Sequence, residues 1–125
     1  MEAANELEKE LNALGVKAKG YKSDAGDFKA AEELVNTVVN DFGTIDVLVN
    51  NAGILRDKTL LKMEDDMWTL VQKVHLDGTF YCGRAAAKYF VDNKIEGRII
   101  NTTSLSGLKG NYGQTNYAAA KAGIA

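Results

Sequence analysis

Three residues near the carboxyl end of the chain have side chains suited to moving a proton: Ser104, Tyr117 and Lys121. Tyr117 and Lys121 are four residues apart, about one helical turn, so a helix would place both side chains on one face. A phenol ordinarily titrates near pH ~10, and an adjacent ammonium stabilises its phenolate. A serine hydroxyl can hold a substrate oxygen against the phenol. The trio therefore suits proton exchange at a carbonyl or an alcohol.

Each of these signals also has an ordinary structural explanation. A Tyr and a Lys at this spacing often occur by chance, with the tyrosine half-buried and the lysine solvated. Serines commonly end strands, and Asn50 and Asn51 could satisfy the backbone of a turn. The joint occurrence of these residues on suitable elements, in a consistent order, favours the chemical interpretation.

Helices are predicted where apolar residues recur at three- and four-residue spacing. The first two end at Gly15 and Gly43, where a left-handed cap belongs, and Asp27 is the expected N-cap of the second. An acidic cluster suits the start of the third, and a bend is possible near Gly78. The predicted helical ranges are 2–14, 27–42, 64–74, 76–93 and a last helix from about Asn116, which follows a glycine-rich loop.

Three strands are predicted between these helices. Residues 16–22 alternate apolar or small residues with lysines, which is typical of a strand near a sheet edge. Residues 45–49 are almost continuously apolar, which indicates a central parallel strand covered on both faces. Residues 98–103 form the third strand, after a turn at Gly97. Residues 54–62 are expected to be a loop.

This alternation predicts an α/β fold, a parallel sheet flanked by helices, as a single domain over residues 1–125. Ligands of such sheets bind beyond the carboxyl ends of the strands. Asp24, the corner at residues 50–53 and Ser104 all follow a predicted strand directly. We therefore expect them to share one edge of the sheet.

The composition excludes several classes of function. The net charge of −2, without basic runs interleaved with aromatic residues, argues against a nucleic-acid partner. A single cysteine, Cys82, and a single histidine, His75, provide neither a disulfide nor a common zinc site. No apolar run is long enough to span a bilayer, so we expect no membrane partner and a cytoplasmic protein.

The motifs resemble those of the short-chain dehydrogenase/reductase family. They are Asn-Asn-Ala-Gly at residues 50–53, Ser104 followed by Leu-Ser-Gly, and Asn-Tyr-Ala-Ala-Ala-Lys-Ala-Gly at residues 116–123. The resemblance covers essentially the whole chain. It implies a Rossmann-like sheet, incomplete here with about three strands, and hydride transfer between a nicotinamide cofactor and a carbonyl or hydroxyl carbon.

The resemblance also implies a role for each site residue. Tyr117 would be the catalytic acid/base, Ser104 would orient the substrate oxygen, and Lys121 would favour the tyrosine phenolate and bind the nicotinamide ribose. The expected cofactor is NADP, with NAD as the alternative. Asp24 and Ala25 would lie along its adenine, and the small residues Asn51, Ala52 and Gly53 would form the surface on which it rests. Tyr117 and Lys121 would also contact it.

Within the family, residues 47–53 and 113–123 most resemble 3-oxoacyl-acyl-carrier-protein reductases of fatty acid synthesis. Acetoacetyl-CoA reductases and 3-hydroxyacyl-CoA dehydrogenases follow closely and are the alternatives. His75 stands where the family usually has a catalytic asparagine, and it resembles the dehydrogenase part of multifunctional beta-oxidation enzymes. Imidazole can relay a proton through water, so we predict His75 as a fourth catalytic residue; simple packing on its helix is the competing interpretation.

The family also predicts features outside the matched motifs. Its glycine-rich phosphate-binding loop has no counterpart in residues 1–125, so the chain is expected to be a partial domain. The isolated chain would stay poorly folded, pair strands 16–22 and 45–49 directly, or associate with another copy. Expected partners are an acyl thioester on acyl carrier protein or CoA, and further copies of the chain, as a dimer or tetramer through helices 63–93. A catalytically silent folding or association module is the alternative from another class.

Overall fold

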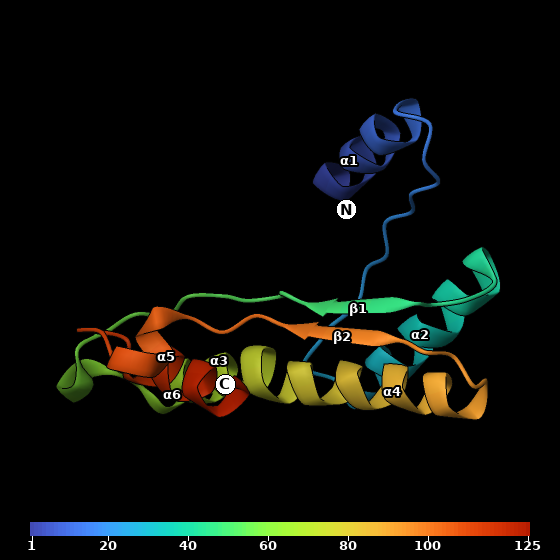
Figure 1. The fold of residues 1–125 in the computed structure, drawn as a ribbon. Coiled ribbons are helices and arrows are strands. Elements are labelled where there is room, and N and C mark those ends of the chain that lie inside the picture. The colour runs from blue at the N-terminus through green and yellow to red at the C-terminus, as the bar shows by residue number, and fades with distance from the viewer.

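The computed structural model describes residues 1–125. It contains one two-stranded sheet, six α-helices, one 3₁₀ turn and one π-helical segment, drawn as a ribbon in Figure 1. In chain order these are α1 (Glu2–Ala13), α2 (Phe28–Phe42), β1 (Val47–Asn50), η1 (Leu60–Lys62), α3 (Asp65–Val71), η2 (Gln72–Asp77), α4 (Gly78–Asp92), β2 (Arg98–Asn101), α5 (Leu105–Lys109) and α6 (Thr115–Ile124).

The sheet pairs β1 with β2 in parallel, in a register that sets Val47 opposite Arg98 and Asn50 opposite Asn101. The predicted α/β class and the parallel pairing are confirmed. Helices α2 and α4 lie on one side of the two strands (Figure 1). The expectation that strand 45–49 is covered on both faces is wrong, because Val47 and Val49 are 51% and 55% exposed. The strand also begins two residues later than predicted, at Val47.

Residues 16–22 are extended but form no strand, so the predicted third strand is absent and strands 16–22 and 45–49 do not pair. Side chains satisfy part of this backbone in place of a neighbouring strand. The amide of Asn12 bonds both the N–H and the C=O of Ala18, and the Glu8 carboxylate accepts from the N–H of Gly20. An extended segment becomes a strand only when another backbone lies beside it, and none does here.

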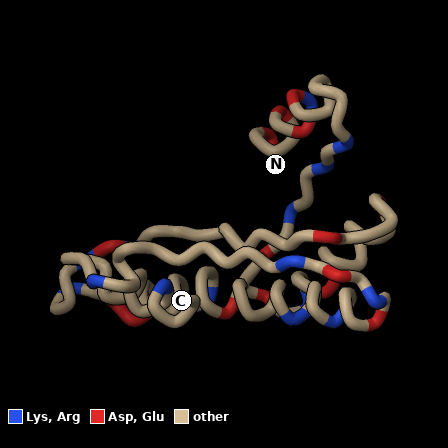
Figure 2. The backbone as a smooth tube through the Cα atoms, viewed as in Figure 1, with Lys and Arg blue, Asp and Glu red and all other residues tan.

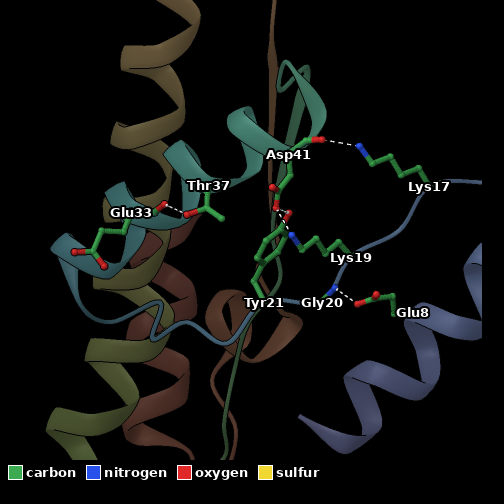
Figure 3. Close-up of polar contacts among 8 residues, drawn as sticks. All are labelled: Glu8, Lys17, Lys19, Gly20, Tyr21, Glu33, Thr37 and Asp41. Atoms are coloured by element: carbon green, nitrogen blue, oxygen red, sulfur yellow. Dashed lines mark hydrogen bonds and ion pairs between the residues drawn. The ribbon is translucent and has the colours of Figure 1, made fainter.

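A second set of contacts ties this extended segment to the end of α2 (Figure 3). The Asp41 carboxylate accepts hydrogen bonds from Lys19 Nζ at 2.6 Å and from the Tyr21 hydroxyl at 2.7 Å, and Lys17 Nζ donates to the Asp41 carbonyl. Burial and the hydrogen bond to Asp41 raise the pKa of Tyr21 to about 12. Helix α1 itself contributes no buried residue and lies apart from the sheet (Figure 1).

The ends of the first two helices follow the predicted capping residues. Asp27 caps α2 by accepting hydrogen bonds from the N–H groups of Lys29 and Ala30. Gly43 ends this helix with φ +85°, and Gly15 after α1 has φ +90°, both in the left-handed region that glycine adopts without steric cost.

Helix α3 continues through the π-helical segment into α4 without interruption. The bend considered near Gly78 is absent, since Gly78 has right-handed helical dihedrals. The helix instead widens over Gln72–Asp77, and π-helical turns of this kind occur frequently at functional sites. This segment carries His75.

Two small clusters form the core. Ala31 and Val35 of α2 pack against Ala86 and Phe90 of α4, while Val71 and Ala120 are fully buried between α3 and α6. Residues 105–109, predicted within a loop, form the short helix α5, which packs on α6. Gly107 makes this contact possible, because a Cβ there would lie 2.6 Å from the backbone nitrogen of Ala122.

Basic and acidic residues are interspersed along the backbone (Figure 2). None of the helices combines the length and the apolar composition that a membrane crossing requires.

Candidate active site

A cleft of about 440 Å³ opens beyond the carboxyl ends of the two strands. The loop after β1, the π-helical segment, the exit of β2 and helix α6 each contribute to its wall. The lining residues are Asn51, Gly53, Ile54, Leu55, His75, Thr102, Tyr117 and Lys121. The fold thus brings together residues that lie up to 70 positions apart in the sequence.

Tyr117 and Lys121 lie on the same face of α6, as their spacing predicts. The ammonium of Lys121 is 5.7 Å from the centroid of the Tyr117 ring, within the range of a cation–π contact. Lys121 is only 4% exposed and donates one hydrogen bond, of 2.9 Å, to the carbonyl of Thr102. An ammonium has three N–H donors, so two remain for a hydroxyl or carbonyl in the cleft.

His75 also contacts the Tyr117 ring. The two rings meet edge to face, with centroids 5.2 Å apart and an interplanar angle of 88°. The Nε2 atom of His75 lies 3.0 Å from the N–H nitrogen and 2.7 Å from the carbonyl oxygen of Ile54, so the tautomer decides which of the two it bonds. His75 therefore connects the tyrosine to the loop after β1.

The imidazole of His75 is neutral near pH 7. Burial lowers its pKa, the hydrogen bond to Ile54 opposes that shift, and the charge of Lys121 adds to the lowering. The Nδ1 atom is buried without a hydrogen-bond partner. An unpartnered polar atom at this depth is costly, because it has lost its contacts with water without gaining a partner.

Gly53 lies directly under the His75 ring. A Cβ at this position would overlap Cε1 of the imidazole, so only glycine leaves room for it. The small size of Gly53 was predicted to let the cofactor rest against it. In the structure, the ring of His75 already requires a glycine at this position.

Ser104 occupies a different place from the other three predicted catalytic residues. It is the N-cap of α5, and its hydroxyl accepts a hydrogen bond of 3.2 Å from the N–H of Ser106. It is half-buried, and no hydrogen bond joins it to Tyr117. Thr102, two residues earlier, lines the cleft in its place.

A second cavity, of about 250 Å³, adjoins the first, because Asn51 lines both. Ala25 and Ala52 lie in its wall, as predicted for the cofactor, and so does Cys82, whose thiol pKa is raised by burial. Asp24 lies outside both cavities; its carboxylate accepts from the N–H of Gly26 at 2.9 Å. The structure thus groups all the predicted cofactor residues except Asp24 around two adjoining cavities, and Asp24 lines a third that adjoins the second of these.

Thr102 and Asn116 are residues of this region that the sequence analysis did not single out. Asn116 immediately precedes Tyr117, is fully buried and fixes the start of α6 through its side chain. Its position next to Tyr117, which is predicted to be catalytic, was the only available signal, and sequence alone does not distinguish a buried asparagine from a solvated one. No group of His, Cys, Asp and Glu side chains is arranged to hold a metal ion.

The family model of short chain dehydrogenases matches residues 1–125. The chain belongs to the short-chain dehydrogenase family. The predicted resemblance is therefore confirmed, and with it the assignment of the chain to a family of oxidoreductases.

The chain also has substantial sequence identity to individual curated relatives. The chain is 55% identical to the peroxisomal hydratase-dehydrogenase-epimerase of Saccharomyces cerevisiae over 91 residues, which is 73% of the chain and 10% of that protein. It is 43% identical to the 3-oxoacyl-[acyl-carrier-protein] reductase of Synechocystis over 122 residues, which is 98% of the chain and 49% of the reductase. The chain thus spans half or less of the length of these relatives.

A solved structure shares the fold as well. The short chain dehydrogenase from Mycobacterium avium superposes with a TM-score of 0.95 at 43% identity, covering 98% of the chain and 44% of that structure. The arrangement of the two strands and their helices is therefore that of the corresponding part of a family member.

Proposed function

We infer that this protein exchanges hydride between a nicotinamide cofactor and a 3-oxoacyl or 3-hydroxyacyl thioester, as a reductase similar to 3-oxoacyl-acyl-carrier-protein reductases does. The observation that supports this proposal best is the cleft in which the Tyr117 ring contacts both the ammonium of Lys121 and the imidazole of His75. Both neighbours are buried.

We assign the two adjoining cavities to the path of an elongated dinucleotide, because Asn51 lines both. One has small side chains in its wall, and the other contains the unused N–H donors of Lys121. When bound, the nicotinamide supplies or accepts the hydride. Asn51, Ala52 and Ala25 would contact the cofactor along this path, with Gly53, Tyr117 and Lys121 at the nicotinamide end. Asp24 lines a third cavity, which shares Tyr21, Ser23 and Leu34 with the one that Ala25 and Ala52 line, so it would contact the cofactor beyond Ala25. The choice of NADP over NAD rests on the similarity to the reductase of Synechocystis.

The residues of the chain handle the proton. The Tyr117 hydroxyl donates its proton to the substrate oxygen during reduction and removes it during oxidation. The charge of Lys121 stabilises the resulting phenolate. His75, hydrogen-bonded to the loop, packs edge to face with the ring and fixes its position. A relay of the proton from His75 through water requires the Nδ1 atom, which is buried here, to become exposed. Ser104 would orient the substrate oxygen if its hydroxyl turns from Ser106 toward the cleft.

The proposed thioester carrier is acyl carrier protein or CoA. One is named for the acyl carrier protein, and another is named a peroxisomal hydratase-dehydrogenase-epimerase. His75 favours an acyl-CoA substrate by its resemblance to the multifunctional enzymes, so 3-hydroxyacyl-CoA dehydrogenase and acetoacetyl-CoA reductase activities are the closest alternatives. The cytoplasmic location stays a prediction, since one relative is named peroxisomal.

Self-association through helices 63–93 is part of the proposal. Trp68, Phe80 and Val91 in this range are 42%, 57% and 76% exposed, so these large apolar side chains are available for contacts with another copy. The same exposed apolar side chains support the second candidate, an association module without catalytic activity.

Replacing Tyr117 by phenylalanine tests the proposal. The Tyr117→Phe variant is expected to bind NADPH as the wild type does and to reduce acetoacetyl-CoA ~10³-fold more slowly, the usual size of a general acid/base effect. Measurements are the fluorescence titration with NADPH and NADH and the steady-state oxidation of NADPH.

Tyr112→Phe is the matched control, because Tyr112 is 87% exposed and lies outside the cleft. It should keep wild-type rates. Absence of saturable binding of either nucleotide to the wild-type chain would contradict the enzymatic proposal and favour the association module.

A further inference from the structure

The side chain of Asn116 is buried completely, next to the tyrosine of the cleft. With Val71, it is the largest side chain of the chain that has no exposure to solvent. Asparagine is seldom fully buried unless its amide is hydrogen-bonded, because an unpaired polar group in the interior costs free energy. The partners of Asn116 therefore show what holds it there.

The amide of Asn116 uses both of its donor hydrogens on backbone carbonyls from other parts of the chain. Its Nδ2 atom donates to Arg56 at 2.8 Å and to Met67 at 3.1 Å, and its Oδ1 atom accepts from the N–H of Tyr117 at 2.8 Å. The reversed amide would set its oxygen against two carbonyl oxygens, so only this orientation satisfies all three groups.

These bonds connect three elements. Arg56 lies in the loop after β1, two residues beyond Ile54, which contacts His75. Met67 belongs to α3, and Asn116 lies in the first turn of α6. The loop is consequently held from two sides, by His75 through Ile54 and by Asn116 through Arg56.

A second amide acts on the same peptide unit. Gln72 donates from Nε2 to the carbonyl of Asn116 at 2.8 Å. Gln72 is the first residue of the π-helical segment, and His75 is the fourth. The Tyr117 N–H and the Asn116 carbonyl belong to the same peptide bond, so one side-chain amide holds each of its two polar groups.

We propose that Asn116, together with Gln72, positions the Tyr117 ring against His75 and the loop after β1. This inference rests on the proposed function, in which Tyr117 handles the proton. Neither amide touches a reacting atom, so both are positioning residues. A shift of the Tyr117 ring by about 1 Å can reduce the rate ~10²-fold even when the cofactor binds normally.

A purely structural role for these amides makes a different prediction. Loss of the bonds would then lower the folded fraction but leave the Tyr117 ring of the folded molecules in place. The imidazole signals of His75 separate the two cases, because this is the only histidine of the chain and its ring lies edge to face with Tyr117.

The test uses Asn116→Ala and Gln72→Met in the full chain, with Asn93→Ala as control. Asn93 makes the same kind of amide-to-carbonyl bond, to Tyr89 at 2.9 Å, but it is exposed at the carboxyl end of α4 and does not line the cleft. The readouts are the His75 ring resonances by NMR, the far-ultraviolet circular dichroism, and kcat and KM for NADPH oxidation.

We expect both variants to keep the helical spectrum, to move the His75 resonances, and to lower kcat at least ~10-fold with the KM for NADPH changed less than ~twofold. Asn93→Ala should match the wild type in every measurement. If Asn116→Ala does not fold, Gln72→Met decides, since it removes a single bond from a half-buried side chain.

Unchanged His75 resonances in folded variants would overturn the proposal, as would a kcat within twofold of the wild type. The NMR measurement needs neither cofactor nor substrate. If the wild-type chain shows no turnover, the proposed function fails, whereas the position of the Tyr117 ring is still decided by the resonances.

Discussion

Residues 1–22 and residues 54–121 differ in where their polar groups find partners. In the first region, exposed or half-buried side chains such as Asn12 and Glu8 satisfy an extended backbone that has no neighbouring strand. In the second, buried side chains such as Asn116 and His75 bond backbone groups from distant elements. The first arrangement links segments close to the surface, while the second fixes the relative positions of loops and helices.

The two regions also differ in how many apolar side chains they bury. Helix α1 has no buried residue, although its leucines follow a regular helical stripe. Helices α2, α4 and α6 contribute most of the buried apolar side chains. An amphipathic sequence therefore predicts a helix, but only a second apolar surface placed against it gives stability.

The largest expected contrast concerns stability. Phe90→Ala removes a ring that is 7% exposed in the α2–α4 core, and we expect a loss of about 3 kcal/mol in the free energy of unfolding. Leu7→Ala in α1 removes a leucine that is 53% exposed, and a change below ~0.5 kcal/mol is expected. Urea denaturation followed by circular dichroism measures both. Equal losses in the two variants would contradict the comparison.

The second contrast is in pH dependence. The pKa of His75 is lowered in the folded state, so the unfolded chain binds more protons below its ordinary value of about 6.5. The stability that this histidine contributes is therefore complete above pH ~6.5 and is lost as the pH falls toward its lowered folded value, by at most ~1.4 kcal/mol per pH unit. Urea midpoints at several pH values measure the slope, and His75→Gln should flatten it.

The pKa of Asp41 is lowered by its hydrogen bonds from Lys19 and Tyr21. Its contribution is present above the ordinary value of 3.8 and is lost as the pH falls through the lowered folded value. Acidification is thus expected to weaken the cleft first and the attachment of residues 17–21 later. If the urea midpoint of His75→Gln depends on pH between ~5 and ~6.5 as steeply as that of the wild type, this order is contradicted.

The smallest expected effect is on the extended segment. Asp41→Asn removes the charge that accepts from Lys19 and Tyr21, and exposed contacts of this kind contribute little to global stability. We expect proteolysis within residues 14–22 to accelerate a few fold, with an unchanged urea midpoint. Asp92→Asn is the control, because it removes an exposed pair with Lys88 on α4. Equal acceleration in both variants would show that Asp41 has no special role.

Much of the fold follows from local patterns. The helices at 2–13 and 28–42, with the caps at Asp27, Gly15 and Gly43, follow from helical periodicity and from glycine conformations that other residues rarely adopt. The parallel strand near residues 47–50 was predicted by its continuous apolar run, within two residues of its start. Helix α5 was missed because a five-residue helix after a serine has too few residues to show a period.

The errors concern features that depend on neighbours. Residues 16–22 have the alternation of a strand, but strand formation requires a second backbone that the pattern itself does not supply. The apolar run at residues 47–49 does not reveal how many of its faces are covered. Both are properties of the tertiary environment.

The sequence by itself determined the one-turn spacing of Tyr117 and Lys121, the glycines at residues 53 and 107, and the order of elements that places these residues beyond the strand ends. Tertiary structure alone decided that His75 lies edge to face with Tyr117, that Asn116 is buried, and that Ser104 caps a helix outside the cleft wall. The reason is physical: spacing along one helix is fixed by backbone geometry, whereas contacts between elements depend on how side chains far apart in sequence share the same interior.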